Sequence, residues 1–224
     1  MFYKHLETYI LPATNHGTYD FTNIAASIGL QIPVAGPLGT FTETQNGSGG
    51  NLKGIELSAS VPLNMVASWL DGFGLMANFS STTSSVVLPN LIGANPSQQV
   101  ADNGQTIPLP GLSHINDKAV FYYEKGGFSA FVAENYRSQY VGSVANSATV
   151  GGYPALIFIA PQHWVSAQVG YELQSGPAKG LGVRFEANNL NKPRYVETKY
   201  DGSNNYSTQT GATYAFRINY RFAN

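Results

Sequence analysis

The sequence predicts an all-β fold in which antiparallel strands run up and down in chain order. Three observations predict it. Several segments of about ten residues alternate between apolar and polar side chains, and successive side chains of a strand point to opposite faces. The connections between these segments are alternately long and short. Charged residues make up only 11% of the 224 residues, against roughly a quarter in soluble domains, while aromatic residues make up 12%.

The clearest strand is residues 213–222, near the end of the sequence. Half of its side chains are polar or small, and they include the cationic Arg217 and Arg221. The side chains between them are apolar or aromatic: Tyr214, Phe216, Ile218, Tyr220 and Phe222. One face of this strand therefore suits water. The other suits either a protein core or lipid.

Seven other segments have a similar length. With residues 213–222, the predicted strands are residues 2–10, 52–63, 72–82, 117–124, 128–136, 164–173 and 181–189. Apolar side chains occupy both sets of alternate positions in residues 128–136, so the facing of that strand stays open. These lengths match tilted strands that cross a bilayer. The mean hydropathy of −0.13 excludes a helical membrane protein.

The connections indicate which environment the sheet occupies. Long connections are predicted as loops at residues 11–51, 83–116, 137–163 and 190–212, and short ones at residues 64–71, 125–127 and 174–180. The long ones are rich in Gly, Ser, Asn, Thr and Pro, which is typical of loops. Outer-membrane barrels have short turns on one side and long loops on the other. The sequence therefore predicts about eight up-and-down, antiparallel strands of a transmembrane β-barrel.

This interpretation gives the two faces of the sheet different roles. Polar side chains are expected to line the lumen: Glu56, Arg184, Glu186, Arg217 and Arg221. Apolar and aromatic side chains are expected to face lipid or to form a girdle at its surface: Phe73, Tyr171, Phe185, Tyr214, Phe216, Ile218, Tyr220 and Phe222.

Six aromatic residues fall in the predicted long loops. Rings in such loops either stack on a ligand outside the cell or pack within the loop. These candidate ligand-binding residues are Tyr19, Phe21, Tyr153, Tyr195, Tyr200 and Tyr206.

The sequence lacks the patterns typical of nucleic-acid-binding, metal-binding and serine-nucleophile sites. The net charge of −1 gives no reason to expect nucleic acid, and the absence of cysteine excludes disulfides and thiolate metal sites. The four histidines are scattered without the spacing of metal ligands. Ser113 does not sit in a Gly-x-Ser-x-Gly motif, because Ile115 takes the place of the second glycine.

The strand glutamates also have a simple interpretation. Most of them fall on the expected lumenal face, where their charges pair with arginines of a polar wall rather than perform acid–base catalysis. They are Glu56, Glu124, Glu134, Glu172 and Glu186. We therefore expect no enzyme activity, no metal and no cofactor.

Four parts of the sequence resemble the C-terminal barrel portion of TonB-dependent outer-membrane receptors. They are residues 53–58 (KGIELS), residues 70–80 (LDGFGLMANFS), the motifs LPGLS, YYEKGGFS and NYRS within residues 109–138, and NNLNKP at residues 188–193 together with the closing YRF at residues 220–222. The resemblance covers nearly the whole chain. Residues 109–138 most resemble the proteobacterial branch that takes up oligosaccharides.

The resemblance implies an outer-membrane active-transport receptor of Gram-negative bacteria, energised through TonB, for a scarce ligand such as an oligosaccharide or a ferric siderophore. Family members carry a signal peptide, a TonB box, a plug domain and about 22 strands. The first three have no counterpart in this sequence. We therefore expect residues 1–224 to form the C-terminal part of such a barrel. This part would contact outer-membrane lipid directly, and the TonB complex only through a plug domain that this sequence lacks.

Two further departures from the family concern single positions. Phe131 stands where the family usually has a basic residue, and Ala223-Asn224 follow Phe222, which is usually the last residue. Two alternatives stay open at this point. One is a complete eight-stranded outer-membrane porin or anchor barrel, and the other is a soluble carbohydrate-binding β-sandwich.

Overall fold

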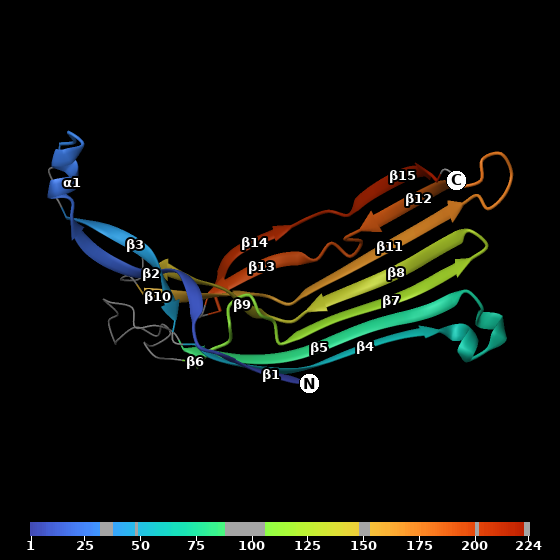
Figure 1. Cartoon of the computed structure of the whole chain (residues 1–224), viewed down its shortest axis with the longest axis horizontal. Coiled ribbons are helices and arrows are strands. Elements are labelled where there is room, and N and C mark those ends of the chain that lie inside the picture. Colours follow the sequence, from blue (N-terminus) through green and yellow to red (C-terminus); the bar gives the residue numbers. More distant parts are fainter. Residues whose placement is uncertain (32–37, 48, 88–105, 148–152, 200–201, 222–224) are drawn as a thin grey trace.

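The main sheet consists of antiparallel strands in chain order (Figure 1). The computed structural model describes residues 1–31, 38–47, 49–87, 106–147, 153–199 and 202–221. In spatial order, the main strands are β1 (Phe2–Leu6), β4 (Gly50–Pro62), β5 (Phe73–Val87), β7 (Ile115–Lys125), β8 (Phe128–Arg137), β11 (Gln162–Glu172), β12 (Leu181–Asn188) and β15 (Thr213–Tyr220). A short strand, β6 (Thr106–Ile107), pairs with the end of β5. The predicted all-β fold of antiparallel strands is confirmed.

Each predicted strand corresponds to one strand of the main sheet. The bounds differ most in two places. The predicted strand at residues 2–10 breaks after Leu6, and a separate strand, β2 (Tyr9–Asp20), begins at Tyr9. β5 continues to Val87 instead of ending at residue 82.

The prediction that the long connections are loops is wrong for three of the four. β2 pairs with β3 (Leu38–Gly47) in a hairpin of its own. A second sheet has the order β14 (Asn204–Gln209), β13 (Arg194–Lys199), β10 (Tyr153–Ile159), β9 (Tyr140–Ser147). These segments form strands because they pair with one another: β2 with β3, β9 with β10, β10 with β13, and β13 with β14. Composition does not reveal such non-local pairing.

Long and short connections lie at opposite ends of the main sheet (Figure 1). The turn between β7 and β8 consists of Gly126 and Gly127, whose φ angles of 60° and 85° are those that a two-residue hairpin requires. Two short 3-10 helices, η1 (Leu63–Met65) and η2 (Ser68–Leu70), connect β4 to β5. The six-residue helix α1 (Thr22–Ser27) lies at the tip of the β2–β3 hairpin. Within the described ranges, no helix has the length and apolar character needed to cross a membrane.

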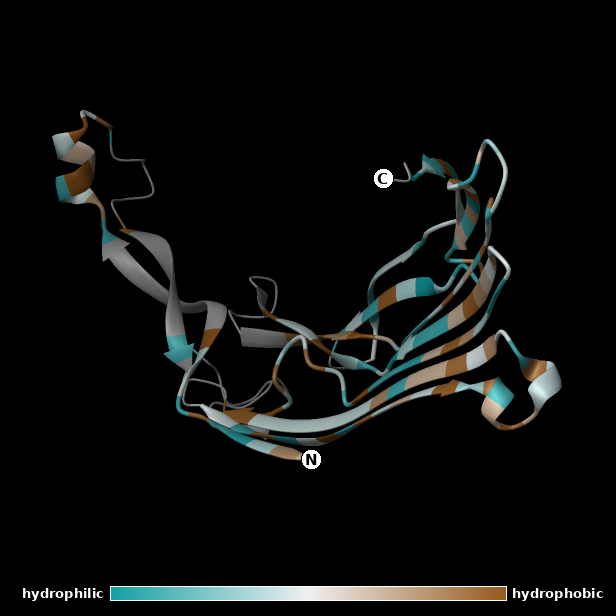
Figure 2. Ribbon diagram, turned by 45° about the vertical axis from the view of Figure 1, so that its right-hand side comes forward, coloured by the Kyte–Doolittle hydropathy of each residue, from teal (hydrophilic) through white to brown (hydrophobic). Residues whose placement is uncertain are grey.

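Hydropathy alternates along the main strands, so that the sheet has an apolar face and a polar face (Figure 2). The register aligns the alternation from strand to strand. One row of direct neighbours on the apolar face crosses seven strands: Val61, Leu75, Phe121, Val132, Ala167, Ala187 and Tyr214. Large side chains of this face remain in contact with solvent. Phe216 and Ile218 are 65% and 67% exposed.

The facing of β8, which the sequence left open, follows from its register. Ala130 and Val132 lie opposite apolar-face residues of the neighbouring strands, whereas Phe131 pairs with Tyr122 and Gln168 and lies on the polar face. Glu134 shares the apolar face with Val132, so it is not among the strand glutamates of the polar face.

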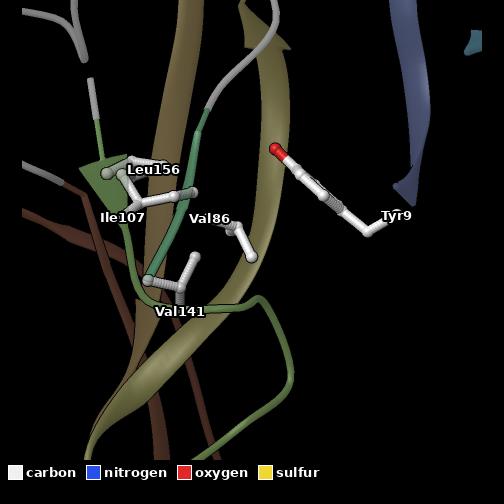
Figure 3. Packing of buried hydrophobic residues seen from close by; sticks show 5 residues of the cluster. All are labelled: Tyr9, Val86, Ile107, Val141 and Leu156. Carbon is white, nitrogen blue, oxygen red and sulfur yellow. The ribbon is translucent and has the colours of Figure 1, made fainter. Parts of the chain in front are cut away.

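The small buried core lies where the main sheet meets its extensions (Figure 3). It consists of Tyr9, Val86, Ile107, Val141 and Leu156, from five different strands. Val86 and Val141 are almost completely buried. The hydroxyl of Tyr9 donates to the carbonyl oxygen of Val87. This cluster joins the β2–β3 hairpin and the second sheet to the main sheet.

The two outermost strands of the main sheet each pair on one side. Among the described residues, β1 pairs with β4 alone and β15 pairs with β12 alone. The sheet is curved (Figure 2) but its described strands do not close on themselves.

Candidate functional site

A hollow of about 720 Å³ lies on the polar face of the main sheet, toward the long connections. We call it the polar hollow. Two rows of direct cross-strand neighbours line it. The first row is Glu56, Ser80, Asn116 and Arg137, and the second is Ser58, Asn78, Lys118, Asn135 and Trp164. The register thus gathers these groups from five strands onto one surface.

The lining of the polar hollow combines one indole ring with many hydrogen-bonding groups. Trp164 lies directly opposite Asn135, whose amide both donates and accepts hydrogen bonds. Four charged residues line the hollow, two of each sign: Glu56, Asp117, Lys118 and Arg137. Binding sites for small molecules commonly place a few polar groups beside apolar and aromatic surface. This arrangement suits a polyhydroxylated ligand, which presents C–H faces to a ring and hydroxyls to polar groups.

Arg137 is fixed at the edge of the polar hollow by three contacts. Its Nε donates to Oγ of the buried Ser113, and its Nη2 donates to the carbonyl oxygen of Gly111. Its guanidinium carbon lies 3.6 Å from the ring centre of Tyr140, which is a cation–π contact. Ser113 therefore has a structural role in holding Arg137.

A group of aromatic and polar residues lies on the second sheet. We call Tyr195, Glu197, Asn205 and Tyr206 the tyrosine patch. The hydroxyl of Tyr195 donates to Oε1 of Glu197 at 2.9 Å, and Nδ2 of Asn205 donates to Oε2 at 3.0 Å. The rings of Tyr195 and Tyr206 meet edge to face, with 6.3 Å between their centres.

Burial and the neighbouring carboxylate raise the pKa of Tyr195 to about 12. Burial has the larger effect because it disfavours the charged phenolate, and the hydrogen bond to Glu197 requires the protonated phenol. Tyr195 is therefore a neutral donor at ordinary pH.

Arg137 and Tyr140 connect the polar hollow to the second sheet. Arg137 is the last residue of β8 and lines the hollow, and Tyr140 is the first residue of β9. β9 belongs to the same sheet as the strands that carry the tyrosine patch. A stacked arginine and aromatic ring therefore stand where one surface passes into the other.

The structure brings together two of the six candidate loop aromatics. Tyr195 and Tyr206 are in contact in the tyrosine patch. Phe21 lies elsewhere, at the start of α1 on the hairpin tip. Tyr200 lies outside the described residues, as do the side chains of Tyr19 and Tyr153.

The candidate lumenal and lipid-facing residues of the main sheet lie on opposite faces of it. The polar face carries Glu56, Arg184, Glu186, Arg217 and Arg221, whereas the apolar face carries Phe73, Tyr171, Phe185, Tyr214, Phe216, Ile218 and Tyr220. Phe222 lies outside the described residues. Arg217 pairs with Glu186 at 3.1 Å, and Arg221 pairs with Glu172 at 3.5 Å.

Sequence reasoning gave no ligand-binding role to Trp164, Arg137 or Tyr140. The pattern placed Trp164 at the start of a strand, and it left open which face of β8 is polar. Cross-strand register, which sequence alternation alone does not determine, gathers the rows of the polar hollow.

His163 lies in β11 rather than in a loop, and its Nε2 pairs with Oε1 of Glu134 at 2.8 Å. The described part of the chain holds no group of three or more histidine, aspartate or glutamate residues that is arranged for a metal ion.

Comparisons of the chain with models of protein families, with curated proteins and with solved structures find no match.

Proposed function

We propose that this chain forms part of the wall of an outer-membrane transport barrel that binds and admits a scarce ligand. The observation that carries the proposal is the apolar face of the main sheet. Its large side chains are exposed across seven strands, while the opposite face is polar. A soluble protein rarely exposes a contiguous apolar surface of this kind, whereas lipid requires one.

The open edges favour a larger barrel over a complete eight-stranded one. Unpaired strand edges are templates for further strands, and β1 and β15 both have such edges among the described residues. On this proposal, additional strands of the same transporter continue the sheet on both sides.

The polar hollow and the tyrosine patch support an oligosaccharide as the ligand. Both combine aromatic rings with amide and carboxylate groups, and both lie toward the long connections, which face the outside of the cell in such barrels. The resemblance to TonB-dependent receptors adds the energy source: TonB acts on a plug domain elsewhere in the transporter. No covalent chemistry is part of this proposal.

A matched pair of variants tests the membrane orientation. Ala77 and Asn78 are neighbours on β5, at nearly the same depth but on opposite faces. Ala77→Arg places a charge in lipid, at a cost of about 2–4 kcal/mol near the midplane, and Asn78→Arg adds it to the polar face. We expect the first variant to insert poorly into lipid vesicles and the second to insert like the unmodified chain. Equal insertion of both variants, or a stable monomer without detergent, would overturn the proposal in favour of a soluble sandwich.

A further inference from the structure

A second hollow, of about 810 Å³, lies on the polar face toward the short turns. We call it the arginine hollow. Tyr122, Phe131 and Gln168 are direct neighbours across three strands and lie on the same face, between the two hollows. The residues in the next row toward the turns are Glu124, Ser129, Gly170, Arg184 and Arg217. The small side chains of Ser129 and Gly170 leave the middle of this row open.

Arg184 and Arg217 lie directly opposite each other on β12 and β15. Residues so placed have Cβ atoms about 5 Å apart, and like charges at such positions destabilise a sheet. Arg217 is paired with Glu186, and Arg221 with Glu172. Arg184 has no ion-pair partner among the described residues. The three arginines and the two glutamates of these pairs together carry one more positive than negative charge.

The remaining carboxylate of the row is too distant to neutralise Arg184. Three interstrand spacings separate Glu124 from Arg184, or about 14 Å. Surface charges at this separation are largely screened at physiological ionic strength. The ion pair between Glu186 and Arg217 relieves part of the repulsion, and one of the two arginine charges stays unbalanced within the described part of the chain.

We infer that Arg184 and Arg217 together bind an oxyanion, a carboxylate or a phosphate, so that the arginine hollow favours ligands that carry such a group. The inference rests on the proposed function and adds the charge of the ligand to it. Guanidinium groups bind carboxylate and phosphate oxygens through paired hydrogen bonds. One oxyanion between them balances the excess charge.

Digalacturonate and its uncharged dimethyl ester form a matched pair of probes, because they share the same sugars and differ in the carboxylates. We expect the intact chain, folded in detergent, to bind the acid at least tenfold more tightly than the ester in a calorimetric titration. Arg184→Gln should remove most of this difference. Lys179→Gln is the control, since it removes an exposed cation from the nearby turn between β11 and β12. It should leave the difference unchanged.

The stability of the same variant separates binding from a structural role. Arg184 has no described partner to lose, so Arg184→Gln should unfold at the same temperature as the unmodified chain, or higher, when no anion is present. A structural arginine would instead lower the unfolding temperature. Arg184→Lys should recover part of the affinity, because it keeps the charge but not the paired donors.

Inorganic phosphate distinguishes the two sources of the anion. Displacement of the acid by phosphate supports the shared site. A second outcome also supports the site: phosphate binds, Arg184→Gln abolishes this binding, and the chain binds acid and ester equally. This outcome assigns the site to free phosphate. Equal binding of acid and ester together with no phosphate binding would overturn the inference. Binding of the ester itself reports separately on the proposed function, and its loss would count against that function.

Discussion

Tyr195 donates a hydrogen bond to the carboxylate of Glu197, two residues further along β13, at a distance of 2.9 Å. Asn205 holds the second carboxylate oxygen at 3.0 Å from the neighbouring strand. The carboxylate is thus fixed beside two tyrosine rings. A preorganised donor and acceptor of this kind bind a polar ligand with little loss of side-chain freedom.

The first prediction concerns the titration of Tyr195. Its pKa is raised to about 12, above the usual value of about 10. A raised pKa means that the fold favours the neutral phenol. The resulting stability is complete below about pH 10 and is lost as the pH rises through 12. We expect the difference in phenolate absorbance at alkaline pH between the unmodified chain and Tyr195→Phe to have its midpoint near pH 12.

Glu197→Gln provides the control for this titration. Removing the carboxylate should lower the pKa of Tyr195 toward the usual value, although burial still holds it above that value. A midpoint near pH 10 for Tyr195 in the unmodified chain would contradict the described hydrogen bond and burial.

The second prediction uses the two tryptophans as reporters. Trp164 lines the polar hollow, whereas Trp69 is 79% exposed in the short turn between β4 and β5. Trp69→Phe leaves Trp164 as the only tryptophan. We expect its emission to change in a saturable manner when a neutral oligosaccharide such as maltohexaose is added. Trp164→Ala should weaken binding about tenfold, or about 1.4 kcal/mol, and leave Trp69 without a response.

If Trp164 emission stays constant with oligosaccharides but changes with a ferric chelate, the ligand is not an oligosaccharide. If Trp69→Phe weakens binding as much as Trp164→Ala does, the binding surface is not the polar hollow.

The third prediction concerns the buried cluster. Leu156 is 3% exposed and packs in the group that joins the second sheet to the main sheet. Leu156→Ala should cost about 2–5 kcal/mol and should loosen the second sheet, as measured by faster amide exchange in β9 and β10. Leu57→Ala is the control because Leu57 is 63% exposed on the apolar face. Equal acceleration by both substitutions would show that this cluster does not hold the second sheet.

The fourth prediction concerns the exposed ion pair at the short turns. Nζ of Lys125 lies 2.9 Å from Oδ2 of Asp71. This hydrogen bond, and next the opposite charge, lowers the pKa of Asp71 and raises the pKa of Lys125. The stabilising effect of Asp71 is present above its unfolded pKa of about 4 and disappears as the pH falls through its lowered value.

Carboxyl NMR of Asp71 measures this shift directly. Lys125→Met should return the titration of Asp71 toward its ordinary range, and concentrated salt should do so in part because both groups are exposed. An identical midpoint in the variant and the unmodified chain would mean that the pair does not persist in solution.

Alternation predicted the main strands well, because a strand with one apolar face must repeat with a period of two. The prediction from composition was wrong for most of the long connections. Residues 140–147 mix apolar with small and polar side chains, residues 204–209 are mostly polar, and neither segment has a clear apolar face, so composition predicted loops. They form β9 and β14 because neighbouring strand extensions satisfy their backbone hydrogen bonds.

In the candidate site, too, local sequence predicted some features and strand pairing determined the others. Tyr195 and Tyr206 were recognisable as aromatic residues in polar surroundings, but their contact depends on the pairing of β13 with β14. Trp164 and Arg137 had no local signal of a shared role.

Residue order was thus sufficient for the strand positions and for the two-faced character of the sheet, since both arise from local periodicity along the backbone. The neighbours across strands had to come from the three-dimensional arrangement. Arg184 opposite Arg217, Trp164 opposite Asn135, and Tyr195 beside Tyr206 all depend on register or pairing between distant segments. If the register of a strand shifted by one residue, all side chains of that strand would move to the opposite face and these contacts would be lost.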